Sequence, residues 1–147
     1  MRAVVQRVSG ARVLVEGETV GEVGEGLCVL VGVAEDDDED AAGRLAHKVV
    51  HLRIFENEDG KFDRSLLDVH GSALVVSQFT LIADSKRQRG TRPSFTHAAR
   101  PEQAEPLYEA FCGALEDHGL DVARGIFGAY MQVELVNDGP VTIILET

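Results

Sequence analysis

Hydrophobic and polar residues alternate along several short stretches of the chain, which is the period of a β-strand with one buried face. Strands are expected on this basis at 2–8, 11–16, 18–23, 73–82, 131–135 and 141–145, with a turn at Gly17. The nearly continuous apolar run Leu27–Val33 instead predicts a strand in the centre of a sheet. Residues 53–62 are typical of a hairpin around Asp59-Gly60.

Two longer stretches repeat their apolar residues every three or four positions, which is the period of a helix. The first follows the acid run Glu35–Asp40, whose charges suit the positive N-terminal end of a helix. Its apolar face is Ala42, Leu45, Ala46, Val49 and Leu52. The second helix is expected to begin at Pro101 and end near Gly119, with Pro106 in or just after the first turn. Its stripe is Leu107, Ala110, Phe111, Ala114 and Leu115. These elements predict an α+β fold.

Size and composition indicate a single domain, residues 1–147, because a chain of this length with 44% apolar residues can bury one core. No apolar run approaches the roughly 20 residues of a membrane span, and the N-terminus lacks a secretory signal, so no membrane partner is expected. Cys28 and Cys112 lie in apolar patterns without a CxxC spacing. They are interpreted as reduced core residues, which predicts a cytoplasmic location.

The formal net charge of −11 argues against nucleic-acid binding by the whole surface, but the charge is unevenly distributed. Residues 1–15 hold three arginines and no acid, and residues 85–101 hold five basic residues and no acid. A local anion site on an acidic protein is one interpretation, and ordinary solvated arginines are the other.

Residues 136–142, VNDGPVT, interrupt the last alternating stretch. Pro140 has no N–H to give to a neighbouring strand, and Gly139 permits backbone angles closed to other residues. Asn-Asp-Gly-Pro is also a good turn sequence. The pattern by itself therefore predicts a hairpin turn between two strands, and a functional use of this turn stays open.

The common catalytic and cofactor motifs are missing, among them the glycine-rich nucleotide loops, HExxH and GxSxG. His47 and His51 stand four apart on the polar face of the first helix, without a carboxylate placed to complete a metal site. His97 is a candidate general base, but nothing places a nucleophile beside it, and a solvated loop histidine is preferred. We therefore expect neither a metal nor a cofactor.

The stretch 75–84, VVSQFTLIAD, is unusual because polar residues interrupt an apolar strand. A strand here would place Ser77 on one face and Gln78 and Thr80 on the other. Buried polar groups need partners, which either the fold or a ligand supplies. This stretch is therefore a candidate site, with structural hydrogen bonds as the alternative.

Two motifs, SQFTL at 77–81 and NDGPVT at 137–142, together resemble the paired signature of the D-aminoacyl-tRNA deacylases. The segments MRAVVQRV, EPLYEAF and RPSF are similar to the same family, and the likeness runs from Met1 to the end of the chain. One departure is Tyr130 in FGAYM, where a smaller or acidic residue is expected.

The resemblance implies a homodimeric hydrolase with a three-layer β/β/α fold, mostly antiparallel sheets and two main helices. The implied substrate is the ester between a D-amino acid and the 3′ end of a tRNA. The pocket lies at the subunit interface, where the SQFT segment of one subunit meets the Gly139-Pro140 turn of the other. That peptide is cis by the family pattern, and the turn is expected to reject L-aminoacyl-tRNA by shape. Glycyl-tRNA, including glycine mischarged on tRNA-Ala, has no Cβ to exclude and is expected to be cleaved.

The resemblance also assigns expected roles. Thr80 and Gln78 are the catalytic candidates, but no base is placed to activate Thr80, so a substrate-assisted route through the ribose 2′-hydroxyl is favoured. The expected substrate-binding residues are Ser77, Phe79, Met131, Asn137, Gly139 and Pro140. The expected tRNA-binding residues are Lys86, Arg87, Arg89 and Arg92. Arg7 is expected to support the Gly-Pro turn or to be a surface arginine of its strand.

Two alternatives from other classes remain at this point. A non-catalytic dimeric RNA-binding domain would keep the frame without the chemistry. A general small-ester hydrolase would need an activated nucleophile, and the sequence offers none.

Overall fold

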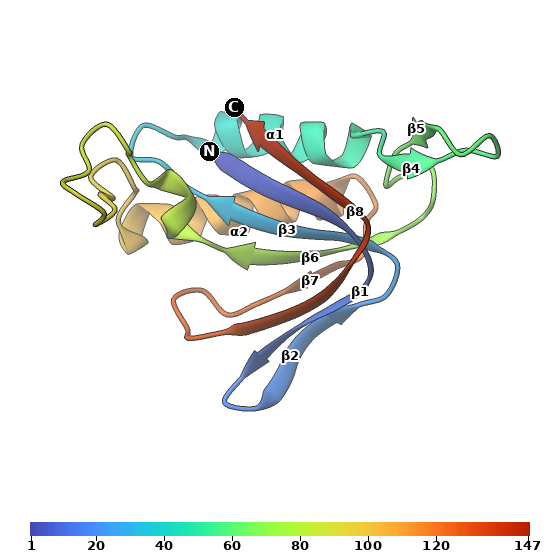
Figure 1. Ribbon diagram of the computed structural model, residues 1–147, viewed down its shortest axis with the longest axis horizontal. Coiled ribbons are helices and arrows are strands. Elements are labelled where there is room, and N and C mark those ends of the chain that lie inside the picture. Colours follow the sequence, from blue (N-terminus) through green and yellow to red (C-terminus); the bar gives the residue numbers. More distant parts are fainter.

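The computed structural model describes all residues 1–147 as one mixed sheet that bends into two layers, with two helices covering one side (Figure 1). The elements in chain order are β1 (Arg2–Val15), β2 (Glu18–Val23), β3 (Gly26–Gly32), α1 (Glu39–His51), β4 (Phe55–Glu56), β5 (Phe62–Arg64), β6 (Ser72–Ser77), the 3₁₀ helix η1 (Phe79–Ile82), α2 (Pro101–Asp117), β7 (Val122–Arg124) and β8 (Gln132–Glu146). Neither α-helix is long and apolar enough to cross a membrane.

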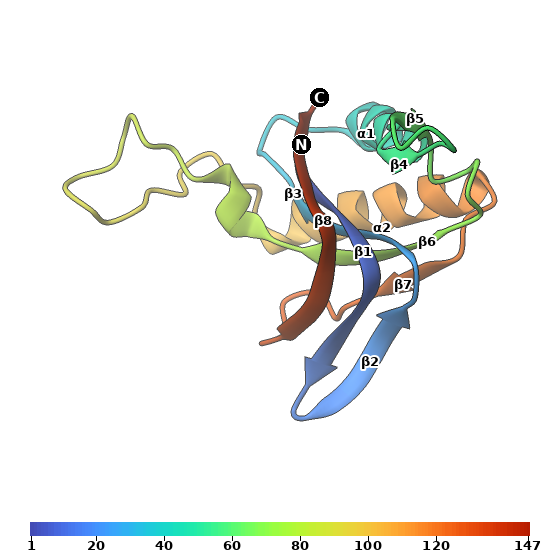
Figure 2. The ribbon, with the colours of Figure 1, turned by 45° about the vertical axis from the view of Figure 1, so that its right-hand side comes forward.

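The main sheet has the order β2-β1-β3-β6-β7, and β8 pairs with β1. β1 and β8 are antiparallel over nearly their whole lengths, so both strands run through the two layers (Figure 2). β3 pairs with the first half of β1 and β2 with the second half. The pairs β3–β6 and β6–β7 are parallel, whereas the pairs that involve β1 are antiparallel.

The middle layer is buried on both faces, which explains the unbroken apolar run of β3. Leu27, Val29 and Val31 lie in the core beneath the helices, whereas Cys28 points into a second core between the two halves of the sheet. Such a strand has no solvent-facing side, so its sequence does not alternate. The expected α+β fold with three β/β/α layers is confirmed, with the correction that one bent sheet supplies both β layers.

Both predicted helices are confirmed. Asp38 caps the first turn of α1 by accepting a hydrogen bond from the Ala41 N–H at 2.9 Å, and the acid run ends in that turn. α2 begins with Pro101 and ends before Gly119, and Pro106 lies just after its first turn without ending the helix. The stripe predicted for α2 missed two fully enclosed side chains, Tyr108 and Cys112.

The hairpins predicted at Gly17 and at residues 53–62 also form. Glu16 and Gly17 both have positive φ, 51° and 80°, which makes the two-residue turn that links β1 to β2. The hairpin predicted at 53–62 is present as β4 and β5. The separate strands predicted at 2–8 and 11–16 were wrong, because they form the single strand β1 with an irregularity between Val8 and Gly10.

The hairpin turn predicted at Gly139-Pro140 is wrong, because β8 continues through it as a bulge. Gly10 pairs with Val136 and Gln6 with Thr142, so four residue steps of β1 face six steps of β8. The two extra residues are an even number, so the inward and outward alternation is unchanged across the bulge. This is why the sequence looks like two strands in the same phase.

The strand predicted at 73–82 is correct only as far as Ser77. The Gln78 N–H bonds the Val31 carbonyl at 2.8 Å, but the Val33 carbonyl accepts from the Ala99 N–H at 2.9 Å. Val33 follows the last residue of β3, and because its carbonyl is already taken, the chain leaves the sheet after Gln78 and turns into η1. The expected placement of Gln78 and Thr80 on one face of a strand is therefore wrong.

Candidate active site

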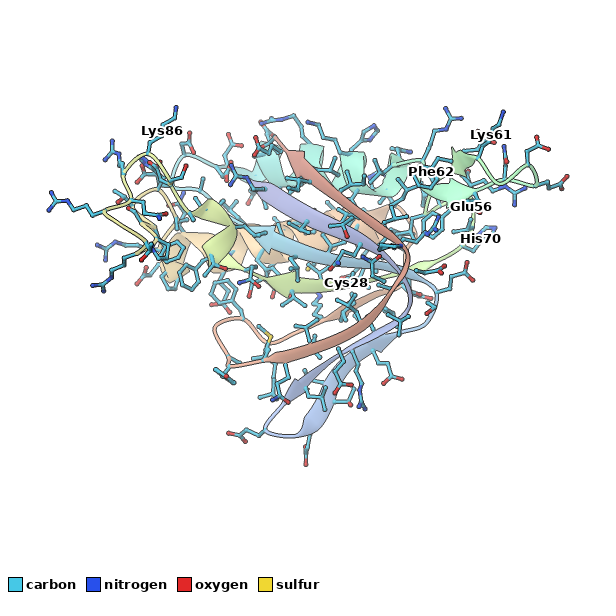
Figure 3. The ribbon with its side chains drawn as sticks, in the orientation of Figure 1. Cys28, Glu56, Lys61, Phe62, His70 and Lys86 are labelled. Atoms are coloured by element: carbon cyan, nitrogen blue, oxygen red, sulfur yellow. The ribbon has the colours of Figure 1, made fainter.

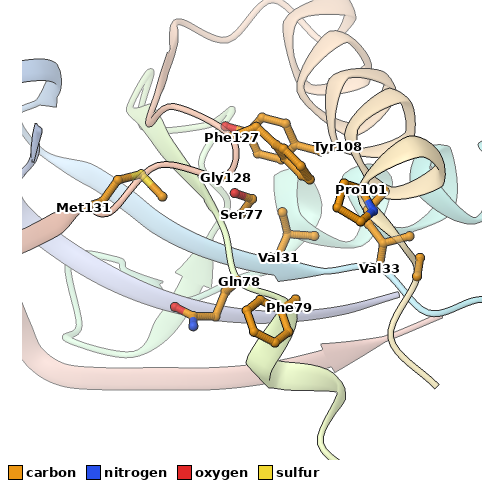
Figure 4. A pocket seen from close by; sticks show the side chains of 12 residues that line it. Val31, Val33, Ser77, Gln78, Phe79, Pro101, Tyr108, Phe127, Gly128 and Met131 are labelled. Carbon is orange, nitrogen blue, oxygen red and sulfur yellow. The ribbon is translucent and has the colours of Figure 1, made fainter. Parts of the chain in front are cut away.

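A pocket of about 390 Å³ opens where β3 and β6 end beside the N-terminal half of α2 (Figure 4). The loop between β7 and β8 forms its remaining wall. Eight of its twelve lining residues are hydrophobic. The lining residues are Val31, Val33, Ser77, Gln78, Phe79, Ala99, Pro101, Ala104, Tyr108, Phe127, Gly128 and Met131. Four expected site residues are thus brought together here: Ser77, Gln78, Phe79 and Met131.

The polar groups of this pocket are few and uncharged. Tyr108 is buried, and its hydroxyl donates a hydrogen bond to the Val75 carbonyl at 3.0 Å. Burial raises the pKa of Tyr108 above its usual value, so this phenol stays neutral. No His, Lys, Arg, Asp or Glu side chain lines the pocket. The lining therefore contains no general base for a nucleophilic hydroxyl.

The 3₁₀ helix η1 begins with Phe79, which lines the pocket, and continues with Thr80, which lies outside the lining. The Thr80 hydroxyl is hydrogen-bonded to the side-chain amide of Gln78. The first 3₁₀ hydrogen bond of η1 runs from the Leu81 N–H to the Gln78 carbonyl, so the N–H groups of Phe79 and Thr80 precede it. Of the three backbone donors at 78–80, the Gln78 N–H is already used within the sheet.

The Gly139-Pro140 bulge of β8 is held from beneath by Arg7. Arg7 is 8% exposed, and its Nε donates to the Asp138 carbonyl at 2.9 Å while Nη1 donates to the Ile54 carbonyl at 2.8 Å. Its guanidinium also lies over the Phe62 ring, 5.7 Å from the centroid. The Gly139-Pro140 peptide is cis. Arg7 is therefore not a solvated surface arginine.

The side chain of Asn137 spans the bulge by hydrogen bonds to residues on its far side. Its Oδ1 accepts from the Val141 N–H at 3.0 Å, and its Nδ2 donates to the Thr142 hydroxyl at 2.9 Å. Both ends of this side-chain amide are thus used within β8. Asp138, Gly139 and Pro140 are exposed to solvent above it.

One chain does not bring the two motifs together. Arg7 pairs with Leu27 at one end of β3, whereas Gln78 bonds to Val31 at the other end. The offset along the strand is about 13 Å, and three strand spacings of about 4.8 Å each separate β8 from β6. Glu56 and Phe62 both lie against Arg7, and Figure 3 shows these two residues at the opposite end of the molecule from Lys86, which follows η1 in the chain.

The basic residues of segment 1–15 and those of segment 85–93 have different surroundings. Arg2 and Arg12 pair with Glu146 and Glu134 across β1 and β8, each at 2.7 Å, and Arg7 is committed to the bulge. The other group, the basic loop, comprises residues 85–93 and extends away from η1 (Figure 2). Its basic residues, which are all exposed, are Lys86, Arg87, Arg89 and Arg92.

The base of the basic loop is held by acidic partners. Asp84 accepts from the Lys86 backbone N–H at 2.9 Å and lies 3.7 Å from Arg87. His97 bridges Glu35 at 2.9 Å and Asp84 at 3.5 Å. His97 lies outside the pocket lining and interacts with these two carboxylates, not with a nucleophile.

His47 and His51 lie side by side on α1, and His118 joins them from the end of α2. The ring centroids are 4.2 to 6.0 Å apart. No three His, Cys, Asp or Glu side chains of the chain meet in a way that could hold a metal ion.

Much of the pocket could not be found from the sequence. Tyr108, Phe127 and Gly128 line it, yet they lie 31 to 51 residues after Ser77 in the chain. Tyr108 has helical spacing and looks like an ordinary core residue. The unusual residue Tyr130 is 91% exposed and stands outside the lining, next to Met131.

Comparisons with known proteins agree on one family. The family model described as D-Tyr-tRNA(Tyr) deacylase matches residues 4–146. A D-aminoacyl-tRNA deacylase of Thermus aquaticus is 54% identical over 147 residues, which cover 100% of this chain and 95% of that protein. One of Symbiobacterium thermophilum is 57% identical and covers 100% and 96%.

Two solved structures are also similar. The c-Myc DNA unwinding element binding protein superposes with a TM-score of 0.91 at 43% identity, covering 100% of this chain and 99% of that one. A probable eukaryotic D-amino acid tRNA deacylase superposes with a TM-score of 0.84 at 18% identity, covering 99% and 98%, which indicates a shared fold.

Proposed function

The chain belongs to the D-Tyr-tRNA(Tyr) deacylase family of hydrolases, and from this premise we propose that it hydrolyses the ester between a D-amino acid and the 3′-terminal ribose of a tRNA. The observation that carries the proposal is the convergence of Ser77, Gln78, Phe79 and Met131 on one pocket without an ionised side chain. Such a pocket suits a reactive ester that needs positioning more than it needs a strong nucleophile.

The proposed chemistry uses the backbone. The N–H groups of Phe79 and Thr80 stabilise the oxyanion that develops when water attacks the ester carbonyl, and the Gln78 side chain keeps the Thr80 hydroxyl oriented. The ribose 2′-hydroxyl of the substrate assists the attack. Thr80 therefore contacts the substrate without acting as the nucleophile.

Chiral selection is proposed to come from a second copy of the chain. The exposed residues 138–140 lie far from the pocket of their own subunit, and β8 has a sheet neighbour on one edge only. Val136 and Ile144 add exposed apolar side chains to this strand. In a homodimer, the bulge of one subunit would close the pocket of the other and occupy the space where an L side chain projects.

Because backbone atoms would do the excluding, the same bulge predicts that glycyl-tRNA is cleaved, including glycine mischarged on tRNA-Ala. Glycine has no Cβ that could meet the bulge. Arg7 and Asn137 would then act by keeping the bulge in one conformation.

The basic loop is proposed to meet phosphates near the 3′ end of the tRNA. Its exposed cations contrast with the rest of the protein, because the whole chain has a formal net charge of −11. The two buried free thiols, Cys28 and Cys112, fit a reducing cytoplasm as the place of action.

One assay tests this function. D-tyrosyl-tRNA, L-tyrosyl-tRNA and glycyl-tRNA-Ala are incubated with the protein, and loss of each ester is followed. We expect rapid loss of the D-tyrosyl and glycyl esters and retention of the L-tyrosyl ester. Binding of tRNA without ester loss would instead identify a non-catalytic RNA-binding domain. Equal cleavage of both tyrosyl esters would contradict chiral selection, and a monomeric mass in solution would contradict the dimer.

A further inference from the structure

η1 carries Phe79 and Thr80, yet its packing does little to hold it in place. None of its four residues is buried. A helix of four residues also gains little from its own hydrogen bonds. The position of η1 must therefore depend on contacts from neighbouring elements.

The two ends of η1 are tied to the sheet by hydrogen bonds. Before its first residue, the Gln78 N–H bonds Val31 of β3 at 2.8 Å. Near its end, the Leu81 carbonyl accepts from Nη1 of Arg2 at 2.6 Å. That carbonyl belongs to the last turn, where no partner exists within the helix.

Arg2 is itself held in place. Its Nε donates to Glu146 of β8 at 2.7 Å, so one guanidinium joins β8 to η1 through two different nitrogen atoms. Lysine has a single ammonium on a flexible stem and lacks this fixed fork of donors. The identity of the residue therefore matters, as well as its charge.

The neighbour of Arg2 on β3 forms the floor beneath η1. Arg2 pairs with Gly32, and a Cβ on Gly32 would lie 2.8 Å from the Gln78 carbonyl oxygen and 3.1 Å from Leu81 Cβ. The start of β1 and the end of β3 thus form one surface that η1 packs against, and the hydrogen bond from Arg2 joins η1 to it.

We propose that Arg2 is a positioning residue of the deacylation reaction, which fixes η1 so that the N–H groups of Phe79 and Thr80 face the ester. This inference rests on the proposed function. Arg2 does not line the pocket, so it acts through η1 and not on the substrate. Its loss lowers the rate of the chemical step and leaves substrate binding nearly unchanged.

The chain supplies a matched control. Arg12 lies on the same strand and pairs with Glu134 of β8 at 2.7 Å, as Arg2 does with Glu146. The hydrogen bonds of Arg12 do not reach η1. Arg2→Gln and Arg12→Gln each remove one guanidinium and one ion pair between β1 and β8. Only Arg2→Gln also removes the hydrogen bond to Leu81.

The experiment measures kcat and KM for D-tyrosyl-tRNA, together with amide hydrogen exchange in residues 78–84, for the intact protein and both variants. Arg2→Gln is expected to lower kcat by about tenfold or more, with KM changed less than about twofold, and to speed exchange in η1. Arg12→Gln is expected to change neither. Arg2→Lys, which keeps the charge and one donor, is expected to give an intermediate kcat.

Equal kcat values for Arg2→Gln and Arg12→Gln, or a loss confined to KM, would overturn the inference. Unchanged exchange in η1 after Arg2→Gln would overturn it as well. Should the intact protein fail to cleave D-tyrosyl-tRNA, the proposed function fails, and the exchange measurement alone decides whether Arg2 fixes η1. Should Arg2→Gln not fold, the comparison of Arg2→Lys with Arg12→Lys takes its place.

Discussion

Thr80 has the hydroxyl that a sequence motif would nominate as a nucleophile, but its surroundings do not activate it. Its partner is the uncharged amide of Gln78, and no ionisable side chain except the neutral Tyr108 lines the adjacent pocket. A threonine hydroxyl at neutral pH needs a base within hydrogen-bonding distance to attack an ester. At the scale of single residues, we therefore expect Thr80 to orient the substrate and not to attack it.

We predict that Thr80→Ala keeps substantial activity, within about tenfold of the intact protein, because the substrate loses one hydrogen-bond donor but no attacking group. Initial rates with D-tyrosyl-tRNA check this. Thr80→Val, of nearly the same volume, serves as the control for packing. A folded Thr80→Ala protein without measurable turnover would restore threonine as the nucleophile.

We predict that Gly139→Ala displaces the bulge. Gly139 has a φ of +139°, and an added Cβ would lie 2.7 Å from Val141 Cγ2 and 3.1 Å from Nη2 of Arg7. The strain is expected to cost about 1–3 kcal/mol of stability and to reduce discrimination between D- and L-tyrosyl-tRNA. Urea unfolding and the ratio of the two cleavage rates measure these effects.

Gly43→Ala is the control for this substitution. Gly43 lies exposed on α1 with open space where its Cβ would be, so alanine there is expected to stabilise the helix by about 1 kcal/mol and leave both rates unchanged. Discrimination that survives Gly139→Ala intact would remove the bulge from the selection of handedness.

At the scale of elements, η1 and the basic loop both depart from what the pattern of residues predicts. The alternation at 73–82 continues as if one strand were present, but Ala99 takes the acceptor that the next strand residue would need. The chain therefore leaves the sheet within two residues of Ser77. The basic loop begins beyond η1, anchored at its base by Asp84 and His97.

The basic loop yields a prediction about ionic strength. Arg89→Ala combined with Arg92→Ala removes two exposed charges at the loop tip, and tRNA binding should weaken while its dependence on salt becomes shallower. The slope of log K against log salt should fall by about 2, one for each phosphate that the loop no longer neutralises. Binding titrations between low and moderate salt measure it.

Arg44→Ala combined with Lys61→Ala removes the same charge from exposed positions on α1 and the β4–β5 turn. If both double variants lose affinity equally, the effect belongs to the net charge and not to the basic loop.

At the scale of the whole molecule, the two cores each enclose one thiol. Cys28 lies between the halves of the sheet and Cys112 beneath the helices (Figure 3 labels Cys28). Burial raises the pKa of each thiol from 9.0 to about 11. Both groups hold their protons in the folded protein at pH values where the unfolded chain loses them.

This difference predicts a loss of stability in base. Below pH 9 the two thiols are protonated in both the folded and the unfolded state, so their contribution to stability is fully present. As the pH rises from 9 through 11, the unfolded chain loses these protons first, which favours the unfolded state. The free energy of unfolding should fall by on the order of 2 kcal/mol for each thiol. Urea unfolding at pH 7, 9, 10 and 11 measures the slope.

Cys112→Ala should make the fall of the unfolding free energy with pH shallower. Cys28→Ala, in the other core, should have the same effect. The pKa of Tyr108, raised mainly by burial, adds a contribution of the same sign. Cys28→Ala keeps this contribution, and Cys112→Ala keeps the part due to burial, because Cys112 also raises the pKa of Tyr108. A slope in the variants equal to that of the intact protein would contradict the assignment.

The sequence by itself determined the local structure. The helical stripes, the Glu16-Gly17 turn and the doubly buried strand β3 follow from periods and turn residues within about fifteen positions of one another. The SQFTL and NDGPVT motifs likewise led to the family, because each is a contiguous stretch.

The tertiary structure decided what depends on distant partners. Gly139-Pro140 is a bulge and not a hairpin because β8 pairs with β1, whose residues lie more than 100 positions earlier. Residues 79–82 form η1 because Ala99 takes the Val33 carbonyl just beyond β3, and Arg2 reaches Leu81 only because β1 and β3 are neighbours. Backbone donors and acceptors pair with whichever groups the fold brings next to them. A local pattern of hydrophobic residues does not specify which distant residue that partner is.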